Sequence, residues 1–213
     1  MEHDSVMPEE NEPRFTRIQQ EKRDVILGAA LNVFSAGGFR GSTIDQIAEA
    51  AGMSKPNVLY YFASKDAIYR SLLQQLLDTW LAPLRQLDPE GDPLEELLKY
   101  VRVKLYMSRD FPRESRLFAH EILEGAPQLR DVLETELKAL IDAKVAILND
   151  WIERGAIARS DPHHLIFSIW ALTQHYADFE TQVDAVLGAG HDPFAEAELF
   201  LDNLYRRMLA VRE

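Results

Sequence analysis

Apolar residues recur with the three- to four-residue period of an α-helix along most of the chain, and no long segment alternates as a strand does. Glycine and proline punctuate this pattern at intervals. The spacing therefore predicts an all-α protein with nine helices. They cover about residues 17–36, 43–51, 54–61, 64–82, 93–105, 112–123, 133–154, 162–187 and 193–213.

Two short helices between residues 43 and 61 carry signals at their ends. Thr43 and Gln46 have the spacing of a capping box. Gly52 can supply the left-handed conformation that a sharp turn needs, and Ser54 is a good N-cap for the next helix. We expect the pair to pack as a helix-turn-helix.

The second helix of this pair places Val58 and Phe62 on its inner side. Lys55, Asn57 and Tyr60 remain outside. In a helix-turn-helix the second helix enters the DNA major groove, where an asparagine can read a base edge and a lysine can meet a phosphate or a guanine. The alternative is an ordinary helical hairpin whose polar residues are simply solvated.

The residues that follow favour the DNA-binding interpretation. Hydroxyl groups of two adjacent tyrosines can donate to phosphates, and Ser64 can cap a fourth helix with Lys65 in its first turn. The predicted DNA-binding residues are Thr43, Lys55, Asn57, Tyr60, Tyr61 and Lys65.

This run resembles the N-terminal domain of the TetR family of bacterial one-component transcription regulators over about residues 17–70. The resemblance implies that the protein binds double-stranded operator DNA and responds to a small-molecule effector. Many members have a phosphate-binding tyrosine where this chain has Leu59. The departure places more of the backbone binding on Tyr60, Tyr61 and Lys65.

Polar residues within apolar surroundings indicate a ligand cavity in the C-terminal part. Trp170 and Gln174 share a face of one predicted helix, with His175 next to them, and Trp80 could close the other side. An indole offers a flat surface and an amide offers paired donor and acceptor atoms, which suit a small planar ring. The alternative is aromatic core packing with a satisfied glutamine. Weaker candidates are Tyr106, Arg116 and Phe118.

Three separated stretches extend the family resemblance into this part: TWLAPL at 79–84, SRLF at 115–118 and LIFSIWALTQHYADF at 165–179. They are similar to a branch of the family that regulates pyrimidine utilisation. That resemblance implies uracil or thymine as the effector, bound near the positions of Trp80, Trp170 and Gln174.

A homodimer is expected, because a two-fold operator presents two reading sites about 34 to 36 Å apart. The family resemblance implies an interface of two C-terminal helices from each subunit. The predicted apolar seam contains Phe194, Ala197, Leu201, Leu204, Met208 and Val211, with Phe167 and Ala171 on the preceding helix. The same stripe could instead pack only within its own chain.

Charge divides the chain into three parts. The formal net charge is −12, and residues 1–13 contain five acidic residues and no Lys or Arg. Residues 14–70 contain eight Lys or Arg against five acids, whereas residues 71–213 contain 15 against 25. We predict a disordered acidic arm (1–13), a helix-turn-helix domain that meets phosphate (14–66), and a helical ligand-binding and dimerisation domain (67–213).

Other functional classes find little support. The chain has no cysteine, and no apolar run approaches the roughly 20 residues that span a bilayer, so a cytoplasmic protein is expected. His120 to Glu124 resembles a zinc-protease HExxH run, but Glu124 replaces the second histidine. No phosphate-binding or nucleophile motif is present, and neither an enzyme nor a cofactor or metal site is expected. A helical enzyme or carrier and a structural adaptor remain the alternatives.

Overall fold

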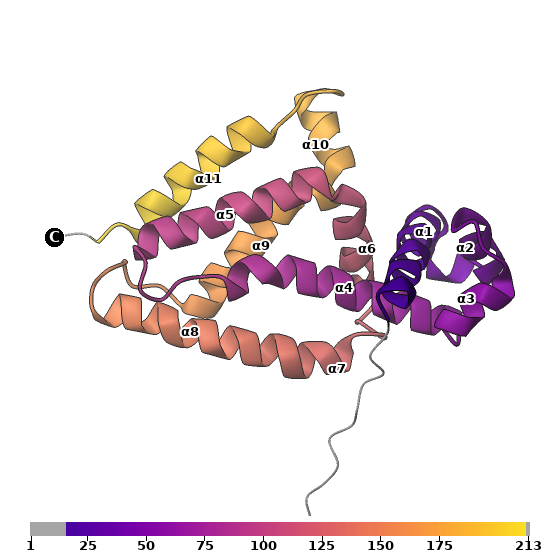
Figure 1. Cartoon of the computed structure of the whole chain (residues 1–213). Helices are drawn as coiled ribbons and strands as arrows, with labels where there is room; N and C mark the ends of the chain where they lie inside the picture. The colour runs from indigo at the N-terminus through magenta and orange to yellow at the C-terminus, as the bar shows by residue number, and fades with distance from the viewer. Residues whose placement is uncertain (1–15, 212–213) are drawn as a thin grey trace, which may run out of the picture. The chain divides into compact units, whose positions relative to one another are not determined.

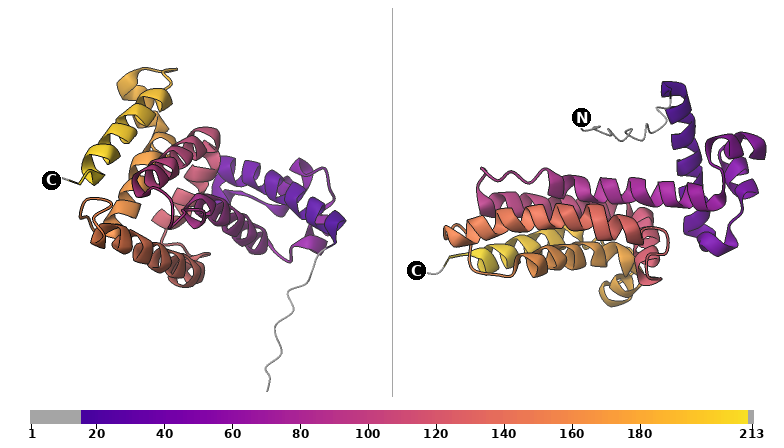
Figure 2. Two further views of the ribbon diagram at one scale, coloured as in Figure 1. Left: turned by 60° about the vertical axis from the view of Figure 1, so that its left-hand side comes forward. Right: turned by 90° about the horizontal axis from the view of Figure 1, so that it is seen from below.

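The computed structural model describes residues 16–211. The chain divides into two compact units, Met1–Ile68 and Tyr69–Glu213, which we call the head and the body. Within the described residues all regular structure is helical, which confirms the all-α prediction (Figures 1 and 2). The predicted acidic arm, residues 1–13, lies outside the described residues.

From residue 16 onward, the head contains three helices and the start of a fourth. They are α1 (Arg17–Gly41), α2 (Ile44–Ala50), α3 (Lys55–Tyr61) and α4 (Lys65–Arg85), the last continuing into the body. Helix α1 is interrupted at Gly38, whose φ of 66° belongs to the left-handed region. The side chains that these helices bury in the head include Ile26, Ala30, Phe34, Ile47, Ala48, Val58 and Ile68.

The local signals that predicted α2 and α3 are realised as hydrogen bonds. Thr43 Oγ1 accepts from the Gln46 amide at 3.2 Å, and Gln46 Oε1 accepts from the Thr43 amide at 2.8 Å. Gly52 adopts a φ of 64° in the turn, and Ser54 Oγ accepts from the Asn57 amide at 3.4 Å. Local contacts, between residues at most four positions apart, therefore begin and end both helices.

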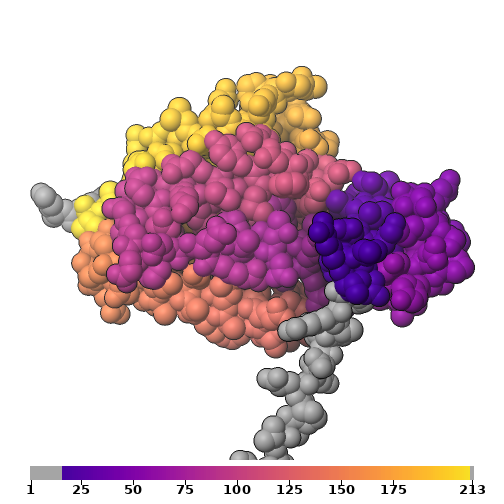
Figure 3. Space-filling view, viewed as in Figure 1, coloured from indigo at the N-terminus to yellow at the C-terminus, as the bar shows by residue number. Residues whose placement is uncertain are grey.

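The body consists of helices that surround a second core. Helix α5 packs against α9 and α11, and α9 also contacts α6 and α8 (Figure 1). In the space-filling view, α4, α5 and α11 share one face of the body (Figure 3). The elements after α4 are α5 (Pro93–Asp110), α6 (Pro112–Leu123), α7 (Arg130–Val132), a π-helical turn η1 (Leu133–Leu137), α8 (Lys138–Glu153), α9 (Pro162–Asp178), α10 (Glu180–Leu187) and α11 (Phe194–Leu209).

The predicted eighth helix is wrong in one respect, because it is two helices. Helix α9 ends at Asp178, and α10 begins at Glu180 after the non-helical Phe179. Arg116 of α6 donates to the Ala177 carbonyl at 3.1 Å and to the Glu180 carboxylate at 2.9 Å. A cation from a distant helix thus satisfies groups at the break, and no local sequence pattern could reveal it.

Two further boundaries also differ from the prediction. The predicted seventh helix includes the π-helical turn η1, which periodicity does not distinguish from an α-helix. Helix α4 continues past Pro83 to Arg85. There the buried Lys144 ammonium donates to the carbonyls of Arg85 and Leu87 at 3.0 and 3.4 Å, so a lysine from α8 satisfies the end of α4.

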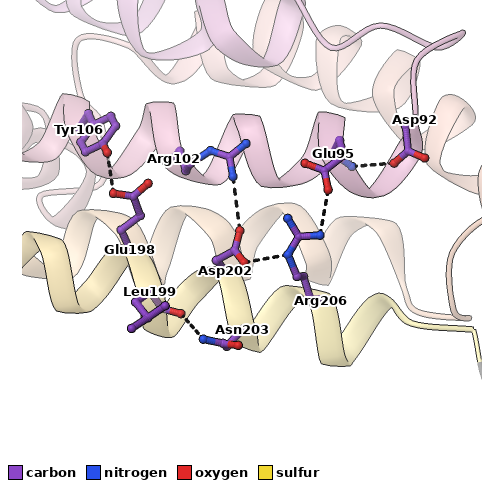
Figure 4. Close-up of polar contacts among 9 residues, drawn as sticks. All are labelled: Asp92, Glu95, Arg102, Tyr106, Glu198, Leu199, Asp202, Asn203 and Arg206. Carbon is purple, nitrogen blue, oxygen red and sulfur yellow. Dashed lines mark hydrogen bonds and ion pairs between the residues drawn. The ribbon is translucent and has the colours of Figure 1, made fainter.

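Helix α11 presents three different faces. One face enters the core of its own chain through Ala197, Leu201, Tyr205 and Leu209. A second face meets α5 through polar contacts, among them Arg206 to Glu95 at 2.8 Å and Arg102 to Asp202 at 3.3 Å (Figure 4). The third face is exposed and apolar. Assigning Ala197 and Leu201 to an intersubunit seam was therefore wrong, because both are at most 3% exposed within one chain.

Candidate functional site

The outer face of α3 is exposed. Asn57 and Lys55 are exposed, and Tyr60 is 72% exposed, whereas Val58 on the same helix is fully buried. Because the helix is anchored by its inner face, its outer side chains are free to enter a groove. No hydrogen bond of the Asn57 amide side chain to another residue occurs in the described part of the chain, so its donor and acceptor both face solvent.

An acidic partner lies beside the predicted reading lysine. Lys55 Nζ is 2.9 Å from Asp45 Oδ2, and the two side chains are 48% and 67% exposed. Exposed ion pairs of this kind contribute about 0 to 1 kcal/mol, so a phosphate can readily compete for the ammonium. This ion pair holds the Lys55 side chain toward α2, and the sequence did not predict the contact.

The two tyrosines of the head differ in accessibility. Their rings form an edge-to-face pair with centroids 5.0 Å apart, and Tyr61 is half-buried whereas Tyr60 is exposed. The Arg23 guanidinium of α1 donates to the Tyr61 carbonyl at 2.8 Å and lies 4.0 Å from the Phe62 ring centroid. Arg23 therefore fixes the end of α3 from α1, a role that the sequence did not reveal.

Lys65 has a structural role that the sequence did not predict. Its ammonium donates to the carbonyls of Phe39 and Ser42, both at 2.8 Å, and lies 4.4 Å from the Phe39 ring centroid. Two of its three N–H donors thus close the end of α1, which leaves it less suited to phosphate than a solvated lysine. Thr43 is exposed at the start of α2, and its hydroxyl is engaged in the capping box.

The body contains a cavity of about 630 Å³ that is open to solvent on one side. Four helices and the π-helical turn supply most of its lining, and most of the lining side chains are apolar. This volume lies in the range of small-molecule sites, which typically combine apolar walls with a few polar groups. The lining residues are Leu77, Trp80, Leu81, Lys104, Arg116, Phe118, Ala119, His120, Ile122, Leu123, Leu133, Leu137, Trp170, Gln174, Asp178 and Phe179.

Three predicted ligand residues meet in this cavity. Trp80 comes from α4, and Trp170 and Gln174 come from one face of α9. The Trp170 indole already donates to the Tyr100 hydroxyl at 2.7 Å, so it offers the cavity its ring rather than its N–H. Among the described residues, none forms a hydrogen bond with the side-chain amide of Gln174. Its paired donor and acceptor are therefore available to a ligand.

The fourth predicted residue, His175, does not line the cavity. Its ring is exposed and stacks on Phe179, with centroids 5.1 Å apart. One residue after Gln174, a helix has turned by roughly 100°, which explains the difference. Of the weaker candidates, Arg116 and Phe118 line the cavity, whereas the Tyr106 hydroxyl donates to Glu198 at 2.5 Å.

Two charged cavity residues were not predicted from the sequence. Lys104 is 2% exposed, and burial lowers the pKa of its ammonium to about 8, with the charge of Asp178 opposing the shift. Burial raises the pKa of Asp178, although Ser115 Oγ donates to its Oδ1 at 2.6 Å. A signal was present in the sequence, since Lys104 interrupts the apolar stripe of α5 between Val101 and Leu105.

Comparison with known proteins agrees with this arrangement. Residues 26–72 match the model of the tetR family of bacterial regulatory proteins, and residues 73–212 match that of the C-terminal region of YcdC-like proteins. The sequence is 53% identical over 174 residues to the HTH-type transcriptional regulator RutR of Escherichia coli strain K12, covering 82% of each chain. The chain belongs to the TetR family.

Solved structures show the same fold as this TetR-family regulator. SCO4942 of Streptomyces coelicolor superposes with a TM-score of 0.73 at 25% identity, covering 90% of this chain and 99% of the other. The fatty acid degradation regulator FadR of Bacillus halodurans gives 0.65 at 19% identity, covering 92% and 96%.

These relationships decide between the classes of function left open by the sequence. The matched families and RutR are DNA-binding transcriptional regulators, and this chain is a regulator of that kind, not an enzyme. Members of the family bind operator DNA and small-molecule effectors, usually as dimers. Within residues 16–211, no helix is long and apolar enough to cross a membrane.

Proposed function

We propose that this TetR-family regulator represses transcription by binding a two-fold operator as a homodimer, and that uracil or thymine releases it. The observation that carries the effector proposal is the body cavity, in which Trp80, Trp170 and Gln174 converge. Two indole rings suit a flat ring, and one uncommitted amide suits its lactam edge. The 53% identity to RutR supports the same branch of the family.

In the head, α3 reads the bases and the groups around it bind phosphate. Asn57 faces an adenine or another base edge, and Lys55 exchanges Asp45 for a phosphate or a guanine. The hydroxyl of Tyr60 contacts the DNA backbone, helped by Tyr61 and by Thr43 at the start of α2. Lys65 adds to the local positive charge while it closes α1.

We expect Asn57→Ala to relax the sequence preference of operator binding. Losing a bidentate base contact costs about 1 to 3 kcal/mol at the cognate site and little on unrelated DNA. Tyr60→Phe is the matched control, because it removes one exposed hydroxyl and should weaken binding to all sequences alike. Titrating both variants against operator and scrambled duplexes at several salt concentrations measures the difference. Equal loss of preference in the two variants would contradict these roles.

The homodimer forms through exposed apolar side chains of the C-terminal helices. Phe167 of α9 is 47% exposed, and on α11 Leu199 and Phe200 are 66% and 58% exposed. Large apolar side chains exposed on these two helices indicate an interaction site. A two-fold axis through this face would pair α9 and α11 with their copies in a four-helix arrangement.

Release requires that the ligand prefer a conformation in which the two heads no longer match successive grooves. Helix α4 contributes Lys65 to the head and Trp80 to the cavity wall, so a ligand against Trp80 acts on a helix that also belongs to the reading unit. Linkage then demands that operator DNA weaken ligand binding by the same factor.

Calorimetry and operator binding test the effector proposal together. We expect uracil or thymine to bind the wild-type protein and to reduce its affinity for the DNA beside its own gene. A ligand at a hundredfold excess over Kd also raises the free energy of unfolding by about 2.7 kcal/mol, which a thermal shift detects. Absence of binding by both pyrimidines would reject them as effectors. A shift with another metabolite would instead identify a TetR-type regulator of a different ligand.

A further inference from the structure

The Lys104 side chain is buried and charged, and it lines the cavity. Only 2% of the residue is exposed, and its Nζ lies 4.6 Å from the centroid of the Trp80 ring. Throughout residues 16–211, no hydrogen bond or ion pair within 4.0 Å engages this ammonium. Asp178 influences it only through its charge, from a greater distance.

An ammonium in this position needs an acceptor. Burying a charge that has three N–H donors is costly unless oxygen atoms meet it, and contact with an aromatic face replaces only part of the lost hydration. The lowered pKa of Lys104 has the same origin, because burial is its largest cause. The cavity wall therefore presents a positive donor toward whatever molecule occupies it.

We infer that Lys104 determines the specificity of the cavity by donating to a ring carbonyl oxygen, so that the site selects oxo-pyrimidines over amino-pyrimidines. This inference rests on the proposed function and names a residue that discriminates between ligands of the same shape. A carbonyl oxygen accepts from the ammonium, whereas an exocyclic amino group would place donor against donor.

The neighbouring groups complement such a ligand. Asp178 lines the same cavity and can accept from a ring N–H, and the Gln174 amide can both donate and accept. A lactam edge has a carbonyl acceptor beside an N–H donor, and it therefore satisfies a cation and an anion together. Cytosine has the same ring and size as uracil but an amino group in place of one carbonyl, which makes it the matched probe.

The test compares uracil and cytosine binding by calorimetry in the wild type, in Lys104→Met and in Lys99→Met. Methionine keeps the length and apolar stem of lysine but has neither charge nor donors. We expect Lys104→Met to weaken uracil binding about ten- to a hundredfold and to leave cytosine binding little changed, so the preference collapses. Lys99, on the same helix with a side chain 60% exposed, is the control and should behave as wild type.

Thermal melting without ligand separates this role from a structural one. Because Lys104→Met removes an unpaired buried charge, we expect its Tm to equal or exceed that of the wild type. A marked fall in Tm would overturn the inference, since it would show that the ammonium stabilises the fold itself. Unchanged uracil binding or an unchanged preference in Lys104→Met would overturn the inference alone. Failure of the wild type to bind uracil and thymine would remove the proposed effector, and the inference with it.

Discussion

Phe200→Glu is expected to yield a folded monomer whose operator affinity is about 10²- to 10⁴-fold lower than that of the wild type. Phe200 is 58% exposed on the outer face of α11, so glutamate there does not disturb the core of a single chain. In a two-fold interface the same change would bury two like charges, which strongly opposes association. A monomer also loses the high effective concentration of the second head that a dimer provides.

Sedimentation measures the association state, circular dichroism measures folding, and gel shift measures operator affinity. Ala146→Glu on α8 is the matched control, because it places the same charge at another exposed apolar position. It should remain dimeric and bind the operator normally. A folded dimer of Phe200→Glu would show that the interface lies elsewhere, and a dimer lost in Ala146→Glu would move it to α8.

Gln174→Ala is expected to abolish release by uracil and thymine while operator binding is retained. The amide lies in the cavity and forms no hydrogen bond with another described residue, so its removal costs the protein little and leaves the polar edge of the ligand unpaired. Such a loss corresponds to about 1 to 3 kcal/mol, or roughly ten- to a hundredfold in Kd.

The adjacent His175→Ala supplies the control for this experiment. His175 is exposed and outside the cavity lining, and its replacement should leave ligand binding and release unchanged. Calorimetry of both variants, followed by gel shift with added uracil, measures the two steps separately. Normal binding and release in Gln174→Ala would mean that the ligand uses other groups of the cavity.

The head is the part that the sequence determined most fully. The capping box of Thr43 and Gln46, the left-handed Gly52 and the Ser54 cap act over a few residues, and the structure contains all of them. Helix starts and turns depend on nearby backbone donors and on allowed dihedral angles, and a sequence encodes both locally. The helical periodicity of the apolar residues in the body is likewise a local property of the sequence. Trp170 and Gln174 could be placed together because they lie one turn apart on one helix.

Tertiary structure decided what depends on distant partners. Arg116 meets the break after α9 across the body, and Lys65 closes α1 from 26 residues beyond Phe39. An apolar stripe does not say whether its partner is the same chain or another, so only packing divided α11 into a buried face with Leu201 and an exposed face with Phe200. Likewise, the sequence alone predicts that a lysine within an apolar stripe is solvated, because it does not show which helices cover it. In the folded body, neighbouring helices bury Lys104, and it becomes a cation on the cavity wall.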